Sequence, residues 1–433
     1  MQNGVYIDSS SIATIKKFLA GYARRFDMSI ILDSNSHIYA RGDYLYKKYD
    51  LIAGFANKSD GSEMMTNLKD LTEIDSSLDH WYLGYITYDI KNSIETLQSK
   101  NPDHLKWPEL LFFKPSILFL IRNNKLEVNY NNRNFILQDF LDEAYSSITI
   151  LRQVEDFNLK PRMNKEEYLY CAKKIINHIK RGDIYELNYC QEFYNNLTID
   201  PYGTYLSINQ HSPSPFSAFL KIDNHFLLSA SPERFLKKET AKIISQPIKG
   251  TAPRGDNKRK DDLYQNYLRT STKERAENIM ITDLVRNDLS KLALKNSVTV
   301  EELCGIYAFP HIYQMISTIS ATIKPVTFAD IIKATFPMGS MTGAPKIKAM
   351  QLIENYETVK RGLYSGSVGY IAPGMDFDFN VVIRSLQYDA KKGYLSYMTG
   401  SALTALSDMD KEYEECLLKS YAINPDQQSI HYA

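Results

Sequence analysis

Short strand-like runs separated by turns, with long amphipathic helices between groups of them, limit the folds open to this chain. Residues 216–222 (FSAFLKI), 226–231 (FLLSAS) and 241–248 (AKIISQPI) follow one another with only turn residues between them. Successive strands without an intervening helix pair as antiparallel neighbours, whereas a doubly wound parallel sheet needs strict β–α–β alternation. The pattern therefore predicts an α+β fold with mostly antiparallel sheet.

Three stretches have the apolar periodicity of helices that pack on a core. The first begins after Asn164, which can cap it with Glu167 at the reciprocal position, and it ends at Gly182. The other two helices are expected at about residues 271–292 and 408–422.

One segment is the best candidate for a domain boundary. Residues 152–163 are polar, contain a proline and have no periodicity. A chain of 433 residues is long enough for two or three domains of about 150 residues. We therefore expect an N-terminal subdomain at residues 1–155 and a second domain at residues 156–425.

The charge balance and hydropathy exclude several classes of protein. Lys plus Arg and Asp plus Glu number 51 each, whereas a protein that binds nucleic acid through its phosphates carries a basic excess. The most apolar stretch, residues 110–121, contains Lys114 and Pro115 and is too short to span a bilayer. The first ten residues lack the pattern of a signal peptide, and the four cysteines show no C-x-x-C spacing. We expect a cytoplasmic protein with reduced thiols and neither a nucleic-acid nor a membrane partner.

Two pairs of glutamates indicate a possible metal site. Glu274 and Glu277 lie three residues apart on the second predicted helix, and Glu412 and Glu415 lie three apart on the third. This spacing places each pair on one helical face. Four carboxylates on two helices suit a hard divalent cation such as Mg²⁺. The alternatives are a helix cap for the first pair and a solvated face for the second.

Lys249 follows an apolar run and precedes a Gly-Thr turn. A lysine held against buried backbone can have its pKa lowered, which makes the neutral amine available as a nucleophile. The alternative is an ordinary surface lysine after a strand.

Two further segments have turn-like or charged patterns. Residues 336–350 (FPMGSMTGAPKIKAM) place glycines before a helix expected to start near Lys346, and such a helix N-terminus can hold an anion. The Walker A spacing is not matched. Residues 253–262 (PRGDNKRKDD) alternate in charge, which predicts an exposed loop.

Six motifs occur in order between residues 164 and 422, namely PIKGTAPRG, KERAENIMITDLVRNDLS, FPMGSMTGAPK, RGLYSGSVGY, FDFNVVIRS and EYEECLLKSYA. Together they resemble the chorismate-binding family, which includes anthranilate, aminodeoxychorismate, isochorismate and salicylate synthases. The resemblance implies a large two-layered, mostly antiparallel β-sandwich with helices outside and the active site between its sheets. It also makes residues 156–425 the chorismate-binding catalytic domain.

The resemblance implies that Mg²⁺ bridges enzyme carboxylates to the ring carboxylate of chorismate. By motif position, Glu277 and Glu415 are expected to be direct ligands. Glu274 and Glu412 are expected to act behind them through water.

Lys249 distinguishes members of the family. Relatives that make anthranilate, isochorismate or salicylate typically have a small residue here, whereas similar aminodeoxychorismate synthases have lysine. The resemblance implies that Lys249 attacks C2 of chorismate while the C4 hydroxyl leaves, and that ammonia then adds at C4 and expels the lysine. Glu233, in SPERF, is expected to be the general acid and base that assists the departing hydroxyl.

The resemblance also assigns contacts with the substrate. Arg384 and Tyr364 are expected to hold the enolpyruvyl carboxylate, with a strand-edge ion pair and a core position as the respective alternatives. The remaining residues expected in the substrate pocket are Thr251, Thr342, Gly343 and Lys419.

Two positions depart from relatives. Gln314 stands where many have histidine, and Glu186 stands where members that add water have a general-base lysine. The second departure agrees with ammonia as the nucleophile.

The expected activity is amination of chorismate with ammonia to 4-amino-4-deoxychorismate, in p-aminobenzoate and folate biosynthesis. None of the four cysteines lies in the Gly-x-Cys-x-Gly context of a fused glutaminase, so a separate glutaminase subunit is the expected source of ammonia. The alternatives are anthranilate synthase component I and a catalytically inactive regulatory homologue.

Overall fold

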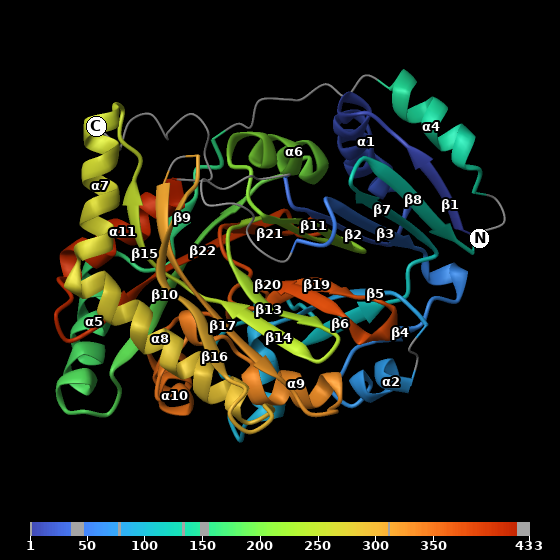
Figure 1. Cartoon of the computed structure of the whole chain (residues 1–433). Coiled ribbons are helices and arrows are strands. Elements are labelled where there is room, and N and C mark those ends of the chain that lie inside the picture. The colour runs from blue at the N-terminus through green and yellow to red at the C-terminus, as the bar shows by residue number, and fades with distance from the viewer. Residues whose placement is uncertain are drawn as a thin grey trace.

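The computed structural model describes residues 2–35, 47–76, 79–131, 135–147, 156–310 and 312–421. Two large sheets stack on each other with helices on their outer surfaces (Figure 1). Every strand pairing within the described residues is antiparallel. The predicted α+β sandwich is therefore confirmed.

The first sheet contains strands from both halves of the chain. Its spatial order is β1 (Gln2–Tyr6), β8 (Lys125–Tyr130), β7 (Ile117–Arg122), β3 (Leu51–Ala56), β2 (Met28–Asp33), β11 (Phe216–Ile222), β12 (His225–Ser231), β21 (Ser385–Asp389), β22 (Tyr394–Leu403), β10 (Glu186–Asn196) and β18 (Gly343–Ala344), with β9 (Lys160–Pro161) also paired to β10.

The second sheet is likewise built from distant segments. Its spatial order is β15 (Ile248–Pro253), β17 (Ile312–Thr322), β14 (Lys242–Gln246), β13 (Arg234–Glu239), β20 (Phe377–Asn380), β19 (Ser367–Ile371), β5 (Tyr82–Ile86), β6 (Leu110–Phe113) and β4 (Met64–Met65), with β16 (Thr299–Ala308) also paired to β17.

The helices cover the outer faces and one end of the sandwich (Figure 1). Near the first sheet lie α1 (Ser9–Tyr22), α4 (Leu137–Ser146), α6 (Pro201–His211) and α10 (Lys346–Tyr356), and near the second lie α2 (Leu71–Ser76), α3 (Lys91–Ile94), α8 (Thr272–Ser290) and α9 (Phe328–Thr335). At one end lie α5 (Lys165–Lys180), α7 (Lys258–Thr270) and α11 (Met409–Tyr421).

Apolar side chains fill the space between the sheets and the spaces under the helices. Met28 and Ile30 of the first sheet share a buried cluster with Tyr85 and Phe113 of the second. Burying each such side chain contributes about 1.5–3 kcal/mol. This shared cluster explains why the two sheets stack rather than separate.

Strands from the segment before residue 156 take part in both sheets. β2 pairs with β11, and β5 pairs with β19. The predicted boundary near residue 155 lies partly outside the described residues and stays a prediction. The two halves are nevertheless joined by continuous hydrogen bonding in each sheet.

Two helix caps and one helix start agree with the sequence. Asn164 and Glu167 form the predicted reciprocal cap of α5. Ser271 accepts a hydrogen bond from Glu274 N at the start of α8, and α10 starts at Lys346 as expected. The helix expected at 408–422 is α11.

The predicted exposed loop at residues 253–262 is wrong from Lys258 onward, where α7 begins. Asn257 caps this helix by accepting a hydrogen bond from Lys260 N. Arg254 Nε lies 2.8 Å from Asp261 Oδ1. The charged residues among 256–260 are exposed as predicted, but from Lys258 onward they form the first turn of a helix rather than a loop.

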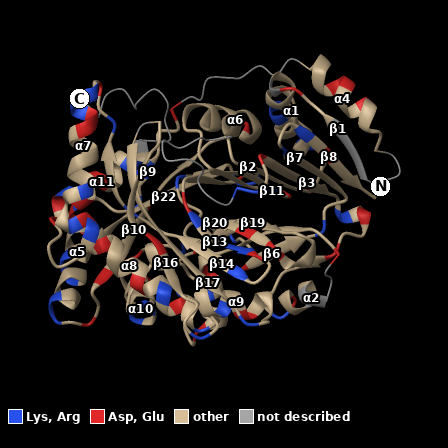
Figure 2. Ribbon diagram, in the orientation of Figure 1, with Lys and Arg blue, Asp and Glu red and all other residues tan. Residues whose placement is uncertain are grey.

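The structure shows how the charged residues and the cysteines are arranged. Figure 2 shows acidic and basic residues interspersed along the outer helices. Cys171, Cys190, Cys304 and Cys416 form no disulfide. In the described part of the chain, no helix combines the length and apolar character that a membrane span requires.

Candidate active site

Lys249 and Glu186 form a buried ion pair that joins β15 of the second sheet to β10 of the first. Lys249 Nζ lies 2.7 Å from Glu186 Oε1, and their side chains are 10% and 1% exposed. Burial alone lowers the pKa of the amine, but the charges of Glu186 and Glu277 outweigh burial and raise it. The expected lowering is therefore wrong in the free protein, and so is the surface-lysine alternative.

The chain around Gly343 fixes the position of Glu186. β18 pairs with the start of β10, and Asn188 N donates a hydrogen bond to Thr342 O at 2.9 Å. A Cβ atom on Gly343 would lie 2.2 Å from the carbonyl oxygen of Glu186, and the φ angle of Gly343 is +141°. Glycine is required for this approach. Thr342 and Gly343, both predicted to line the substrate pocket, thus lie beside Glu186.

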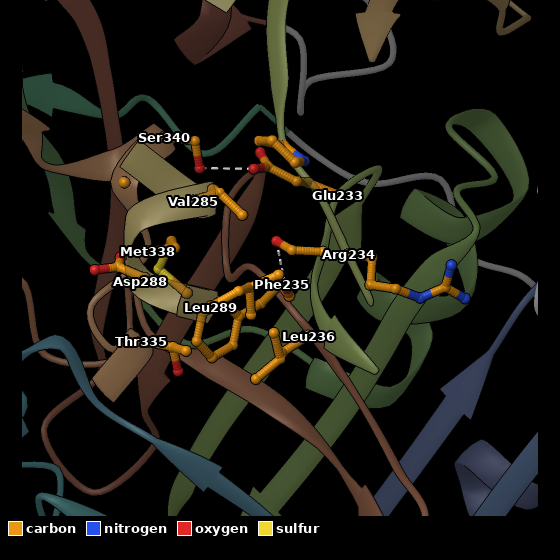
Figure 3. Close-up of a pocket in the computed structure, with 13 residues that line it drawn as sticks. Glu233, Arg234, Phe235, Leu236, Val285, Asp288, Leu289, Thr335, Met338 and Ser340 are labelled. Atoms are coloured by element: carbon orange, nitrogen blue, oxygen red, sulfur yellow. Dashed lines mark hydrogen bonds between the residues drawn. The ribbon is translucent and has the colours of Figure 1, made fainter. Parts of the chain in front are cut away.

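Glu233 lies between β12 and β13 and is almost fully buried. Its Oε1 accepts a hydrogen bond from Ser340 Oγ at 2.6 Å, and Figure 3 shows the two side chains pointing at each other. Burial raises the pKa of Glu233 to about 7, although the Ser340 hydrogen bond and the Lys249 charge act to lower it. A carboxyl group with this pKa is about half protonated near pH 7 and can donate a proton.

Helix α8 carries Glu274 and Glu277 next to Lys249. Asn278 Nδ2 donates to Lys249 O at 3.2 Å and to a carbonyl of β17 at 3.1 Å, which fixes the helix on the sheet. A Cβ atom on Gly250 would lie 3.1 Å from Glu274 Oε2. Burial raises the pKa of Glu277 to about 7, although the charge of Lys249 opposes it.

Helix α11 brings the second pair of glutamates toward α8. Lys273 Nζ, on α8, lies 3.4 Å from Glu412 Oε1 and 3.9 Å from Glu277 Oε1. Glu415 Oε1 lies 2.6 Å from Lys419 Nζ. Partial burial acts to raise the pKa of Glu415, but Lys419 outweighs it and the pKa is lowered. The two acidic pairs thus meet across the two helices, with Lys273 between them.

The donor set formed by these glutamates fits Mg²⁺, which prefers carboxylate oxygens. Glu277 Oε1 is buried and accepts no hydrogen bond from a described group. Burial raises the pKa of Glu274, and the charges of Glu415 and Glu412 add to this effect. A cation would relieve such repulsion. Among the described residues, however, no group of three or more acidic, His or Cys side chains is already assembled as a metal site, so the ligand assignment stays a prediction.

Arg384 and Tyr364 differ in how they meet the site. Arg384 O accepts a hydrogen bond from Ala230 N of β12 at 3.1 Å, and the charge of Arg384 acts to lower the pKa values of Glu233 and Tyr397, although burial raises both. Tyr364 is buried in an apolar cluster, with its hydroxyl 3.7 Å from Cys190 Sγ. Arg384 therefore lies beside β12, the strand that precedes Glu233, whereas Tyr364 has a core position in the free protein.

The other predicted substrate residues surround Lys249. Thr251 lies opposite Gln314 in the β15–β17 pairing. Gln314 is buried, and its Oε1 accepts no hydrogen bond from a described group. Lys419 Nζ donates to Gly400 O at 2.8 Å in addition to its ion pair with Glu415. Gln314 therefore offers an unused acceptor beside Thr251.

A pocket opens behind Glu233, between β13 and helices α8 and α9 (Figure 3). Its walls include Phe235, Leu289 and Met338, and its polar groups include Ser340 and Asp288. Among the described residues, the pocket shares only Glu233 with the set predicted to be functional.

Sequence reasoning missed the ion pair between Arg361 and Glu357, which is buried beside the site. Arg361 Nη2 lies 2.5 Å from Glu357 Oε1, and the two side chains are 1% and 2% exposed. Arg361 also donates to Met341 O at 2.7 Å and Asn188 O at 2.9 Å. It thus ties the Thr342 turn to β10. The four-residue spacing of Glu357 and Arg361 resembles that of an ion pair on the surface of a helix, so it did not indicate burial. The one indication in the sequence was that Arg361 begins the motif RGLYSGSVGY.

Ser340 and Asn278 were also missed, although both lie within motifs that the sequence singled out. Each acts through a hydrogen bond to a residue distant in sequence, Ser340 to Glu233 and Asn278 to the backbone of Lys249. Only the position of each residue inside a motif could have identified it.

Comparisons with known sequences agree with the six motifs. The family model described as chorismate binding enzyme matches residues 28–425. Anthranilate synthase component 1 of Thermus thermophilus is 30% identical over 352 residues, which are 79% of this chain and 76% of that protein. Aminodeoxychorismate synthase component 1 of Escherichia coli is 37% identical over 266 residues, 60% of this chain and 58% of that protein. The chloroplastic aminodeoxychorismate synthase of Arabidopsis thaliana is 33% identical over 82% of this chain, but the match covers only 41% of that protein.

Solved structures share the fold. Anthranilate synthase component I from Streptococcus pneumoniae aligns with a TM-score of 0.71 at 22% identity, over 82% of this chain and 85% of that one. The menaquinone-specific isochorismate synthase of Escherichia coli aligns with a TM-score of 0.73 at 13% identity, over 99% of this chain and 94% of that one. At these identities the likeness concerns the sandwich alone.

Proposed function

The chain belongs to the chorismate binding enzyme family, and from this premise we propose that it aminates chorismate to 4-amino-4-deoxychorismate, as an aminodeoxychorismate synthase component I does. The observation that carries the proposal is the buried Lys249 ammonium held 2.7 Å from Glu186. A small residue at position 249 suits the other reactions of the family. A buried lysine at the same place supplies a nucleophile.

The proposed reaction has two covalent steps. Lys249 Nζ forms a bond to C2 of chorismate, the ring double bonds shift, and the bond from C4 to its hydroxyl breaks. Glu233 gives its proton to that hydroxyl, which departs as water. Ammonia then bonds to C4, the double bonds shift back, and the C2–Nζ bond breaks to free Lys249. The raised pKa of Glu233 supports its role as the acid.

The remaining predicted residues bind and orient the substrate in this proposal. Glu277 and Glu415, with Glu274 and Glu412 behind them, would hold Mg²⁺, which supplies positive charge to the ring carboxylate when it is bound. Arg384, near Glu233, is suited to a bidentate contact with the enolpyruvyl carboxylate. Thr342 and Gly343 lie at the Glu186 side of the site.

Ammonia is proposed to come from a separate glutaminase subunit in the cytoplasm, because none of the four cysteines has a nucleophile-elbow context. Without that partner, high ammonium should sustain the reaction.

Product analysis tests the proposal. Protein incubated with chorismate, Mg²⁺ and ammonium should yield a non-aromatic amino product, which a separate lyase converts to p-aminobenzoate. Direct release of anthranilate and pyruvate would overturn it in favour of anthranilate synthase, the activity named for the Thermus thermophilus relative. Lack of any turnover would favour the inactive homologue.

A further inference from the structure

Glu186 has fewer partners than a buried carboxylate normally has. Its side chain is 1% exposed, and Lys249 Nζ is its ion-pair partner at 2.7 Å. Neither oxygen accepts a hydrogen bond from any other group in the described ranges. Buried carboxylates usually have several donors, because an unsatisfied one is costly. The buried carboxylate oxygens of Glu186 can therefore still accept a proton or a hydrogen bond, and the amine of Lys249 lies next to them.

Glu192, on the same strand, shows the ordinary arrangement. It is also buried, and Arg162 Nη2, Tyr394 OH and Ser396 Oγ donate to its carboxylate at 2.7, 2.8 and 2.7 Å. Such a satisfied carboxylate is a structural anchor. Glu186 lacks these donors, so strand β10 carries one anchored glutamate and one whose carboxylate faces the proposed nucleophile.

The proposed function creates a requirement that this arrangement can meet. Lys249 is an ammonium ion in the free protein, and an ammonium ion has no electron pair with which to attack C2. Its proton must move to an acceptor before the bond forms. Glu186 Oε1 is the carboxylate oxygen of its ion pair and lies 2.7 Å from Lys249 Nζ.

Resting on the proposed function, we propose that Glu186 is a catalytic residue that takes the proton of Lys249 before attack and returns it when the lysine is expelled. The protons then balance. Glu186 holds one proton while Lys249 is bonded to C2, and Lys249 recovers it after the C2–Nζ bond breaks. Glu233 gives its proton to the leaving hydroxyl and regains one from the ammonium group formed at C4. The net change is chorismate plus ammonia to 4-amino-4-deoxychorismate plus water.

A single-turnover experiment tests this role on the step concerned. Protein is mixed with chorismate and Mg²⁺ without ammonium, and intact-mass spectrometry follows the Lys249 adduct over time. In E186Q, adduct formation should slow about 10²- to 10³-fold at pH 7, the usual contribution of a positioned base. The ratio of the E186Q rate to the rate of the unaltered protein should then rise with pH, because solvent must accept the Lys249 proton in the variant, whereas the loss of the Glu233 proton slows both proteins alike.

Two further variants separate a proton acceptor from a structural support. E192Q removes a buried carboxylate from the same strand and should leave the pH dependence of adduct formation unchanged. E186A should be slow, and added formate should restore its rate in a concentration-dependent manner, which a merely structural role would not produce.

The outcomes also separate this inference from the proposed function. If the unaltered protein makes 4-amino-4-deoxychorismate and E186Q forms the adduct at the same rate, the role of Glu186 is wrong and the function stands. Absence of formate rescue in folded E186A would likewise count against it. If the unaltered protein forms no adduct and releases anthranilate, the proposed function fails and takes this role with it.

Discussion

Glu233 and Glu186 are buried glutamates whose charges both raise the pKa of Lys249, yet the groups next to their carboxylates differ. Glu233 is held by the Ser340 hydroxyl, a neutral donor. Glu186 is held by the Lys249 ammonium. Burial outweighs the neutral donor and raises the pKa of Glu233 to about 7, whereas the partner of Glu186 is a cation that carries the proton to be moved in the proposed reaction. Neighbouring groups, rather than residue type, therefore prepare one glutamate to give a proton and the other to take one.

The secondary structure around each glutamate maintains this difference. Glu186 starts a strand that β18 locks at Gly343. Glu233 lies between two strands, and its donor comes from the short turn Gly339–Met341. Both supports belong to the same segment, residues 339–344, which Arg361 ties to β10. One turn thus positions the groups beside both carboxylates.

Removing Lys249, the partner of Glu186, should have the largest effect on activity. In K249A, kcat for chorismate amination should fall by on the order of 10³-fold or more, as expected when a nucleophile is lost. No adduct should appear in the intact-mass spectrum. Unchanged amination would show that the covalent mechanism is wrong for this protein.

K249A should also be less stable, because it leaves Glu186 buried without its cation. Breaking a buried ion pair costs about 3–5 kcal/mol. The double variant K249A/E186Q should recover much of this loss in chemical denaturation while staying inactive. Equal stability of the single and double variants would contradict the buried pair.

Replacing Glu233, the other buried glutamate, should remove the proposed general acid. In E233Q, kcat should fall about 10²- to 10³-fold because the leaving hydroxyl loses its proton donor. The acid form is the active one, so kcat/KM of the unaltered protein should be maximal below pH 7 and fall about tenfold per pH unit above it. This alkaline limb should be absent from E233Q. A pH profile with the same limb in both proteins would assign it to another group.

Glu277 provides a third environment for comparison. Burial raises its pKa to about 7, as for Glu233, but its neighbours are the lysines Lys249 and Lys273 and the carboxylates of Glu186 and Glu274 rather than a hydroxyl. E277Q should lower the apparent affinity for Mg²⁺ about 10- to 100-fold, with activity recovered at high Mg²⁺. Titration of activity against Mg²⁺ after chelator treatment measures this.

Glu414, an exposed residue of the same acidic helix α11, supplies the control. E414Q should titrate like the unaltered protein. Equal Mg²⁺ dependence in E277Q would remove Glu277 from the ligand set.

The sequence predicts those parts of the fold and site that depend on local spacing. Asn164 and Glu167 cap α5 because their contact spans three residues. The glutamate pairs of α8 and α11 share helix faces for the same reason. At Lys258 the same local reasoning failed, because the helix start there depends on the cap by Asn257 and on the Arg254–Asp261 pair rather than on apolar periodicity.

Contacts between distant segments could not be predicted in this way. The Lys249–Glu186 pair depends on how two sheets stack, and its effect on the pKa of Lys249 is opposite to that expected from burial alone. Tyr364 lies in a motif, yet its burial beside Cys190 follows from packing. Motifs therefore indicate which residues lie at the site, while protonation depends on partners that only the fold brings together.

The smallest predicted effect concerns Ser340, the hydrogen-bond donor to Glu233, and tests how much this donor changes the pKa of Glu233. Its hydrogen bond lowers the pKa of Glu233 against the effect of burial, so S340A should raise that pKa further. A hydrogen bond to a charged group contributes about 1.5–3 kcal/mol, and one pKa unit corresponds to about 1.4 kcal/mol. The alkaline limb of kcat/KM should therefore move upward by about one to two pH units, with only a few-fold change in its maximum.

Ser245 offers a matched control for Ser340, because it lines the same pocket but donates its hydroxyl to Phe235 O at 2.7 Å rather than to Glu233. S245A should leave the limb in place. A downward shift in S340A would mean that removing the hydroxyl admits solvent, which lowers the pKa of Glu233 by hydrating its charge. An upward shift in S340A, with no shift in S245A, would show that the hydrogen bond from Ser340 lowers the pKa of Glu233.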